Sequence, residues 1–315
     1  MRENVTKHDE SERGFVLVST LWMVALISIA ATAFVIANRL HIQTIANRGQ
    51  IVRMEAMADG VVEATAFQII FENRGKNINQ SKKVFRDGRY IACRPNENFI
   101  AFVSVQDQNG LIDLNAASPN LLNVLFEKLG VDAVRRQNLI AALQDFRDVD
   151  DVARSGGGEM AAYKTLGRTY GPKNAQLQSV DEVEQVLGFD AALLVPLRKV
   201  VTVYAPRNGF DPQFAPPMLK RLFSVPSRQN LQTGSPVIGG PYSQFYNRGR
   251  GHLFAISVVI KAKTKGWFKR RAIVELVNNE KQLFRIISWR RSLDIENRDE
   301  LIGLVDNAPR CWFNQ

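Results

Sequence analysis

The chain opens with a charged head of 13 residues followed by a long uncharged segment. No charged residue occurs between Gly14 and Asn38, and at about 1.5 Å per residue a helix of this length spans the roughly 30 Å hydrocarbon layer of a membrane. Apolar residues continue to recur near helical spacing as far as about Phe71, with charged residues between them. The pattern predicts one long helix, half in a membrane and half outside it.

Alternation of apolar and polar residues predicts strands after this helix. Segments 90–93 and 99–105 lead into turn residues at 107–110 and indicate a hairpin. Segments 252–260, 271–277 and 284–289 alternate in the same way and predict an antiparallel sheet, and 200–204 is a further β segment.

Helix signals dominate between these two β regions. Ser118 before Pro119 is typical of an N-cap and first helical residue, and Ser179 with Glu182 forms a capping-box pattern. Residues 205–251 are rich in Pro, Gly and Asn and predict loops around one short helix at 217–223. The expected fold class is α+β, with a long N-terminal transmembrane helix, a small antiparallel sheet and an inserted α-helical domain.

Composition adds limits on size, charge and redox state. The 315 residues are enough for about two domains. The net charge of +10 is concentrated late, at Lys261, Lys263, Lys265, Lys269, Arg270 and Arg271. We expect this run to be a solvated hairpin turn, the alternative being a contact for an acidic partner or lipid headgroups. Cys93 and Cys311 are too few for a disulfide framework, and two separate thiols are expected, with one bridge as the alternative in an oxidising compartment.

The N-terminal segment has two interpretations. Ala31-Thr32-Ala33 has the small-x-small form that a signal peptidase cleaves. Against a signal peptide, the head mixes basic residues with Glu and Asp, and the helical pattern continues past this site. A membrane helix that is retained therefore fits this segment better than a signal peptide that is removed.

This combination resembles the type IV pilin and pseudopilin class, whose members have a short charged leader, a Gly at the cleavage site and an aromatic first mature residue. The resemblance implies that a prepilin peptidase cleaves between Gly14 and Phe15 and methylates the amino group of Phe15. Most such subunits carry Glu at the fifth mature position, and Ser19 stands there in this sequence.

The order of motifs along the chain is similar to one subclass, the type II secretion system protein K family of large minor pseudopilins. The motifs are DLNAASPNLLNVL from Asp113, LQDFRDVDD from Leu143, GGGEMAAY from Gly156, LQSVDEVEQVLGFD from Leu177 and SWRR from Ser288. The implied organisation is a cleaved leader (1–14), a transmembrane and protruding helix (15–75), the first part of a pilin-like β domain (76–112), an inserted α-helical domain (113–199) and the second part of the β domain (200–315).

The resemblance also implies a role and a location. The chain would be a minor pseudopilin at the tip of the type II secretion pseudopilus, helping to initiate fibre assembly and protein export across the outer membrane. It would be a single-pass protein of the bacterial inner membrane with the bulk of the chain periplasmic. Its partners would be other minor pseudopilins, inner-membrane proteins of the secretion system and the prepilin peptidase.

Ser19 supports the tip position on physical grounds. In a pilin-like fibre, the buried amino terminus of one subunit is compensated by a neighbour's glutamate, because an unpaired buried ammonium costs several kcal/mol. A subunit with no neighbour above it needs no such glutamate, and the protein K family lacks that residue. The alternative is that Ser19 is a tolerated polar residue of an ordinary membrane helix.

A pilin-like subunit for DNA uptake or nucleic-acid binding is the alternative function. The insert contains segments similar to helix-hairpin-helix motifs, which bind phosphate through backbone amides. The second hairpin glycine is replaced by Asp132 and Asp190, however, and residues 115–204 contain ten Lys or Arg against eleven Asp or Glu. A carboxylate in that place and the lack of excess positive charge argue against nucleic acid as a partner.

An acidic loop is the candidate for metal chemistry. Asp148, Asp150 and Glu159 supply the oxygen ligands that Ca²⁺ prefers, beside Asp145, Asp151 and the glycine run 156–158. Calcium binding by family members in this region supports the site, and the alternative is a solvated acidic loop. The three histidines, His8, His41 and His252, form no catalytic or metal-binding pattern. A non-enzyme is expected.

Overall fold

The computed structural model describes residues 11–74, 84–226, 240–249, 251–263, 265–277, 282–292, 295, 298–306 and 308–314. The side chains of residues 11–15, 40, 43 and 314 lie outside this description, as does most of the predicted leader. The chain divides into two compact units, residues 1–54 and residues 55–315. The first unit contains the larger part of the N-terminal helix, as far as Met54, and the strands of the described residues lie in the second unit.

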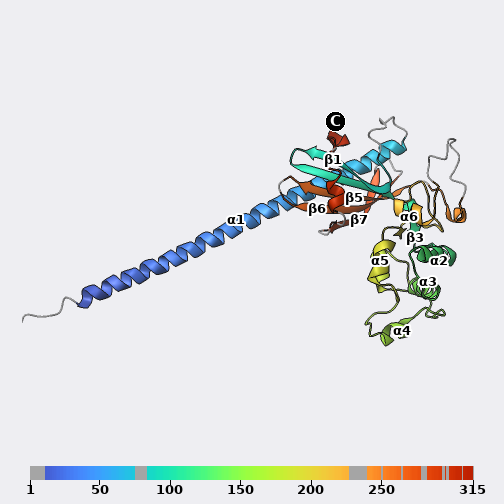
Figure 1. Ribbon diagram of the computed structural model, residues 1–315, viewed down its shortest axis with the longest axis horizontal. Coiled ribbons are helices and arrows are strands. Elements are labelled where there is room, and N and C mark those ends of the chain that lie inside the picture. Colours follow the sequence, from blue (N-terminus) through green and yellow to red (C-terminus); the bar gives the residue numbers. More distant parts are fainter. Residues whose placement is uncertain are drawn as a thin grey trace, which may run out of the picture. The chain divides into compact units, whose positions relative to one another are not determined.

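Helix α1 runs from Ser11 to Asn73 without interruption (Figure 1). All described side chains from Val16 to Arg39 are exposed, and the helix is long and apolar enough to cross a membrane. Its polar side chains bond to their own helix: the hydroxyls of Ser28 and Thr32 donate to carbonyl oxygens four residues earlier, at 2.8 Å in each case. One long helix was predicted, and the structure confirms it.

Five antiparallel strands form the main sheet, in the order β1-β2-β5-β6-β7. They are β1 (Asp87–Asn96), β2 (Phe99–Asp107), β5 (Leu253–Ala262), β6 (Trp267–Leu276) and β7 (Phe284–Ser292). The later part of α1 lies on one face, where Phe67 meets Phe284 edge to face with ring centroids 5.4 Å apart. The opposite face packs Phe102 and Val259 against Leu301. The predicted hairpin and the three C-terminal strands are confirmed.

One residue of the basic run is not solvated as expected. Arg270 on β6 is only 4% exposed, and it donates hydrogen bonds of 2.6 Å to Asp59 and to Glu55 on α1. Its guanidinium also lies over the rings of Trp289 and Phe268, at 5.0 and 5.2 Å. The prediction was wrong here because alternation along β6 turns Arg270 toward the helix, whereas Arg271 faces solvent.

The helical insert is an enlarged hairpin loop of the sheet. Strands β2 and β5 pair residue by residue from Phe99 with Ala262 to Asp107 with Phe254, so residues 108–252 occupy the place of a turn. Two short parallel strands, β3 (Ile112–Asp113) and β4 (Val201–Thr202), lie near the base. The predicted strand at 200–204 is thus reduced to two residues outside the main sheet.

Short helices build the rest of the insert. They are the α-helices α2 (Pro119–Lys128), α3 (Ala133–Arg147), α4 (Met160–Thr165), α5 (Ala191–Leu197) and α6 (Pro217–Leu222), with the 3₁₀ helices η2 (Gln108–Gly110), η3 (Val180–Gln185) and η5 (Ser243–Phe245). Their core includes Phe210, Phe223 and Phe245 beyond the expected boundary at residue 199. Phe210 and Phe245 lie where loops were predicted, and Phe223 ends the short helix predicted at 217–223, which α6 confirms.

The C-terminal segment closes one edge of the sheet. It contains α7 (Arg298–Ile302) and η6 (Trp312–Asn314). The backbone N–H of Arg94 on β1 donates to Pro309, at 2.7 Å, and that of Cys311 donates to Arg94, at 3.2 Å. A disulfide joins Cys93 to Cys311, with the Cα atoms 4.9 Å apart. Two separate thiols were predicted, and this was wrong because the pairing depends on a contact across 218 residues of sequence.

Candidate functional site

The predicted processing site lies within the first turns of α1. The helix passes through Gly14 and Phe15, although the side chain of Phe15 is outside the described residues. Ser19 is exposed, and its hydroxyl donates to the carbonyl oxygen of Val16 at 2.9 Å. At the position where most pilin-like subunits have a carboxylate, this chain therefore presents a neutral group that its own helix satisfies.

The acidic cluster is built around Asp145, in the last turn of α3. Asp145 is fully buried and accepts hydrogen bonds from the backbone N–H of Gly158, at 2.8 Å, and of Arg154, at 3.1 Å. The guanidinium Nη1 of Arg154 also donates to Asp145, at 2.7 Å, and to Asp148. These bonds to Asp145 and Asp148 hold the pKa of Arg154 above its usual value. One carboxylate thus binds the middle and the end of the loop that follows α3.

The three predicted calcium ligands have different environments. Asp150 is exposed and accepts a hydrogen bond from the backbone N–H of Val152, at 2.9 Å. Glu159, just before α4, is only 9% exposed, and neither of its carboxylate oxygens has a hydrogen-bond partner. Asp148 Oδ1 is likewise buried without a partner. Burial raises the pKa of Glu159, and the charges of the aspartates at 145, 148, 151 and 150 raise it further.

These observations test whether the residues fit a calcium ion. The unpartnered oxygens of Glu159 and Asp148 are hard ligands that a divalent cation would satisfy. Across the described part of the chain, however, no three His, Cys, Asp or Glu side chains are grouped as a metal site would require. The fit to calcium is therefore partial. Both carboxylate oxygens of Glu159 and one of Asp148 are free to bind a cation, whereas Asp145 already binds the guanidinium of Arg154.

Sequence reasoning missed Arg154 as part of this cluster. Its position after the acidic run suggested no specific partner, because a loop of unknown conformation does not fix which side chains meet.

A hollow of about 240 Å³, lined by Asn115, Gln144, Arg147, Asp148, Arg154 and Gln176, opens beside these groups. The Asp148–Arg154 pair thus forms part of the wall of this hollow.

The helix-hairpin-helix-like turns use their amides internally. Gly130 and Gly188 both have φ of +83° and open the turns before α3 and α5. Asp132 then accepts the backbone N–H of Arg135 at 3.0 Å, and Asp190 accepts that of Leu193 at 2.9 Å. The carboxylates thus occupy amides at the hairpins that would face a phosphate, which weighs against the nucleic-acid alternative.

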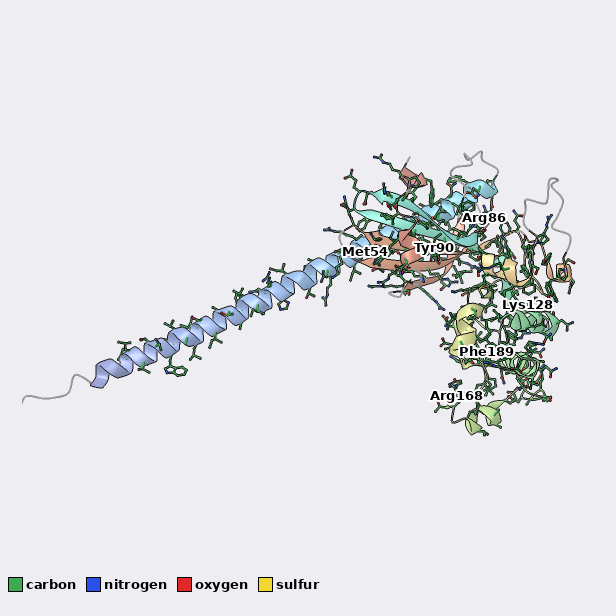
Figure 2. The ribbon with its side chains drawn as sticks, in the orientation of Figure 1. Met54, Arg86, Tyr90, Lys128, Arg168 and Phe189 are labelled. Atoms are coloured by element: carbon green, nitrogen blue, oxygen red, sulfur yellow. A yellow bond between two sulfur atoms is a disulfide. The ribbon has the colours of Figure 1, made fainter. Side chains whose placement is uncertain are left out.

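One of these turns is held by a further ion pair. The side chain of Arg135 donates to Asp190, at 2.6 Å, and to the carbonyl oxygen of Gly188, at 3.1 Å. Next to it, Phe189, which is labelled in Figure 2, packs edge to face on Phe126, with ring centroids 5.8 Å apart. The two turns are therefore joined to each other within the insert.

Two buried aspartates lie where the insert leaves the sheet. Burial raises the pKa of Asp107, at the end of β2, to about 6, although hydrogen bonds from Asn109 and the charge of Arg86 lower it. Burial also raises the pKa of Asp113 to about 6. Asp113 accepts the backbone N–H of Asn115, at 2.7 Å, and that of Ala205, at 2.6 Å. It therefore ties the start of the insert to the segment that follows β4.

A polar contact links the insert to the sheet. Arg290 on β7 donates to the hydroxyl of Ser179, at 3.0 Å, and to Asp181. Ser179 is also the N-cap of η3, where the predicted capping box with Glu182 is present. Two of the quoted motifs, SWRR and LQSVDEVEQVLGFD, thus meet in space.

Comparison with known proteins agrees with this architecture. Residues 98–206 match the family model described as type II secretion system (T2SS), protein K. A chain in the crystal structure of the GspK-GspI-GspJ complex from the type 2 secretion system of enterotoxigenic Escherichia coli has the same fold, with a TM-score of 0.54 at 16% identity, covering 77% of this chain and 99% of that chain. No curated protein sequence matches significantly. The family match across the insert, with the shared fold, confirms the resemblance of this chain to the protein K family of the type II secretion system.

Proposed function

We propose that this chain is a minor pseudopilin of a type II secretion system, a structural subunit rather than an enzyme. The observation that carries the proposal is the protein K match over residues 98–206, which takes in β2 and most of the insert. The uninterrupted apolar helix α1 supports it, because a pseudopilin needs a membrane anchor of this kind.

The partners follow from the related structure. The similar chain was crystallised in a GspK-GspI-GspJ complex, and we infer that this chain assembles with the corresponding minor pseudopilins of its own system. Inner-membrane proteins of the secretion system would hold the assembly before the fibre grows. Cross-linking along α1 in intact cells, followed by mass spectrometry of the products, tests this. Products containing only copies of this chain would contradict it.

A position at the fibre tip is supported by Ser19. Its hydroxyl is satisfied within α1, so the residue brings no charge that a neighbour must compensate. A glutamate there would have no amino terminus above it and would remain an unpaired buried carboxylate. We therefore place this subunit at the start of fibre assembly, and its loss is expected to abolish export across the outer membrane.

Secretion assays with two substitutions at one position test the tip role. In cells lacking the chromosomal copy, Ser19→Ala is expected to restore secretion fully, because it removes only a hydroxyl bonded to its own helix. Ser19→Glu is expected to lower secretion at least tenfold at equal membrane levels of the protein. Full secretion by the Glu variant would show that Ser19 is only a tolerated polar residue.

Processing by a prepilin peptidase belongs to the same proposal. Cleavage after Gly14 would leave Phe15 as the first residue, with a methylated amino group. N-terminal mass analysis of the membrane-extracted protein is expected to show this species. A start at Phe34 would instead indicate cleavage by a signal peptidase after the small-x-small segment.

We place the bulk of the chain in the periplasm, with α1 in the inner membrane. The Cys93–Cys311 disulfide supports this, because disulfides persist in oxidising compartments such as the periplasm. A reporter fused after the C-terminus that is active only in the periplasm is expected to be active. Activity of a reporter that works only in the cytoplasm would overturn the orientation.

Calcium binding by the acidic loop is a second proposal. The unpartnered oxygens of Glu159 and Asp148 support it, and we propose that these two residues, with Asp150 at the exposed rim, hold one Ca²⁺ ion. Bound calcium would also relieve the repulsion that raises the pKa of Glu159. A ligand at a hundred times its dissociation constant stabilises the folded state by about 2.7 kcal/mol.

Thermal unfolding of the full-length protein in detergent tests the calcium proposal. Millimolar CaCl2 is expected to raise Tm relative to EGTA, whereas MgCl2 is not. Glu159→Gln should abolish this shift, and Glu127→Gln, on α2, should keep it. Absence of any calcium response in the wild-type protein would return the cluster to a solvated acidic loop.

A further inference from the structure

The acidic loop contains a cation of its own. Arg154 bridges Asp145 and Asp148 through one nitrogen, with the Asp145 contact at 2.7 Å. The two carboxylates differ in exposure: the Asp145 side chain is fully buried, and that of Asp148 is 22% exposed. Arg154 is itself 40% exposed, so the bridge reaches from the interior to the solvent.

The two carboxylates that Arg154 bridges differ in the other contacts that they make. Asp145 also holds the backbone N–H groups of Arg154 and Gly158. A Cβ atom on Gly157 would lie only 2.1 Å from Asp145 Oδ2, so the loop backbone passes directly against this carboxylate. Asp145 therefore holds the loop closed through these contacts and keeps these hydrogen-bond partners.

Asp148 has a different balance of contacts. One of its oxygens meets Arg154, and the other, Oδ1, is buried without any partner. Glu159 has two such unpartnered oxygens and is raised in pKa by burial and by the charge of Asp148 among others. A divalent cation between Asp148 and Glu159 would satisfy all three oxygens, but it would be repelled by the guanidinium at Asp148.

We infer that Arg154 is a tethered cation that competes with Ca²⁺ for Asp148. Without calcium, the guanidinium bridges Asp145 and Asp148 and holds the loop closed. With calcium, Asp148 turns to the ion and Glu159, and Arg154 remains on Asp145 alone. The inference rests on the calcium site proposed above and assigns it a regulator, because the strength of the Arg154–Asp148 contact then sets the calcium affinity.

Calcium titration calorimetry on the full-length protein in detergent tests the competition. Arg154→Gln removes the competing charge and is expected to tighten calcium binding tenfold or more. Arg154→Lys keeps the charge but not the planar geometry that lets one group serve two carboxylates, and an intermediate affinity is expected. Lys164→Gln removes an exposed charge of α4, and its affinity should stay within twofold of wild type.

A second measurement separates competition from misfolding. In EGTA, Arg154→Gln is expected to lower Tm because two carboxylates lose their counter-ion, and saturating calcium should recover more of that loss than it adds to the wild type. The Tm of Arg154→Lys in EGTA should lie between that of the wild type and that of Arg154→Gln.

The outcomes distinguish this inference from the proposals beneath it. Equal calcium affinity in the wild type and Arg154→Gln would overturn the competition and leave the calcium site in place. Binding by Arg154→Gln but not by the wild type would support the competition and show that Arg154 excludes calcium from the native protein. Failure of both to bind would overturn the site and the competition together, while the pseudopilin proposal would be unaffected.

Discussion

Arg270 joins α1 to the sheet through ion pairs and ring contacts. It is a buried cation with two carboxylate partners on α1 and two aromatic rings beneath its guanidinium. The partners Glu55 and Asp59 are each about a third exposed, so solvent weakens the Coulomb attraction but does not replace the hydrogen bonds.

Removal of this guanidinium should destabilise the protein. We expect Arg270→Gln to lower the free energy of unfolding by about 2 to 3 kcal/mol, toward the lower end for a broken buried ion pair. Arg271→Gln, at the exposed neighbouring position, should change it by less than about 0.5 kcal/mol. Urea unfolding of the detergent-solubilised protein measures both, and similar losses in the two variants would contradict the assignment.

Asp107 should make stability depend on pH. Its pKa of about 6 lies above the ordinary value of 3.8 because of burial, with the neighbouring Asp211 acting in the same direction. The folded state therefore binds the proton more tightly than the unfolded state, so this contribution is complete below about pH 4 and is lost as pH rises through 6. Asp113 acts in the same sense.

A single neutral substitution isolates this effect. Asp107→Asn should reduce the difference in unfolding free energy between pH 5 and pH 7.5 by about 1.4 kcal/mol, because most of the titration of a group with a pKa of about 6 lies in this window. Urea unfolding at the two pH values measures it in each protein. Parallel pH profiles for wild type and variant would show that another group is responsible.

Only some of the residues of the acidic cluster were predictable from the sequence. Asp148 and Glu159 were identified from residue type, because oxygen ligands for calcium can be found in any acidic run. The contact of Arg154 with Asp145 was not predictable, since it depends on a loop that folds back over the end of α3. The burial of Arg270 was missed for a similar reason: strand alternation shows that a side chain changes face but not which face is covered.

Helix ends were the elements best predicted from sequence. Ser118 caps α2 through the backbone N–H of Leu121, and Ser179 forms the expected box with Glu182. Both signals are local, involving residues three apart, and therefore survive any tertiary arrangement. The capped element at 180–185 is nevertheless a 3₁₀ helix, because the sequence pattern does not fix how tightly so short a helix winds.

Ser179 has a second role that its capping pattern did not indicate, as acceptor for Arg290 of β7. Ser179→Ala should therefore lower the free energy of unfolding by about 1 to 2 kcal/mol, at or above the usual loss for an N-cap. Thr165→Ala, which removes a hydroxyl bonded only within α4, should cost less than about 0.5 kcal/mol. Urea unfolding compares them, and equal losses would mean that neither the cap nor the Arg290 contact stabilises the insert.

At the scale of the whole molecule, the disulfide escaped prediction. It depends on a contact between distant segments, Cys93 with Cys311, and the aromatic residues of 210–245 likewise pack against helices far before them in the chain. The segments that form the five main strands were predicted correctly, because alternation is visible within each strand separately, whereas the pairing of β2 with β5 into one sheet was not predicted.

The disulfide should contribute substantially to stability, because it closes a loop across most of the second unit. Replacing both cysteines by serine is expected to lower the free energy of unfolding by about 2 to 4 kcal/mol. Dithiothreitol should produce a similar loss in the wild type and none in the double variant. Alkylation of both cysteines in the unfolded, unreduced wild-type protein would show instead that the bridge is absent.

The direct pairing of β2 with β5 has an evolutionary consequence. The sheet is complete across this junction without the 108–252 segment, since Asp107 already faces Phe254 in register. Changes in the length or content of the segment therefore leave the strand order and the side-chain alternation of the sheet intact. By its connections to the sheet the insert is a single heritable module, since both of its ends lie at one paired position of β2 and β5.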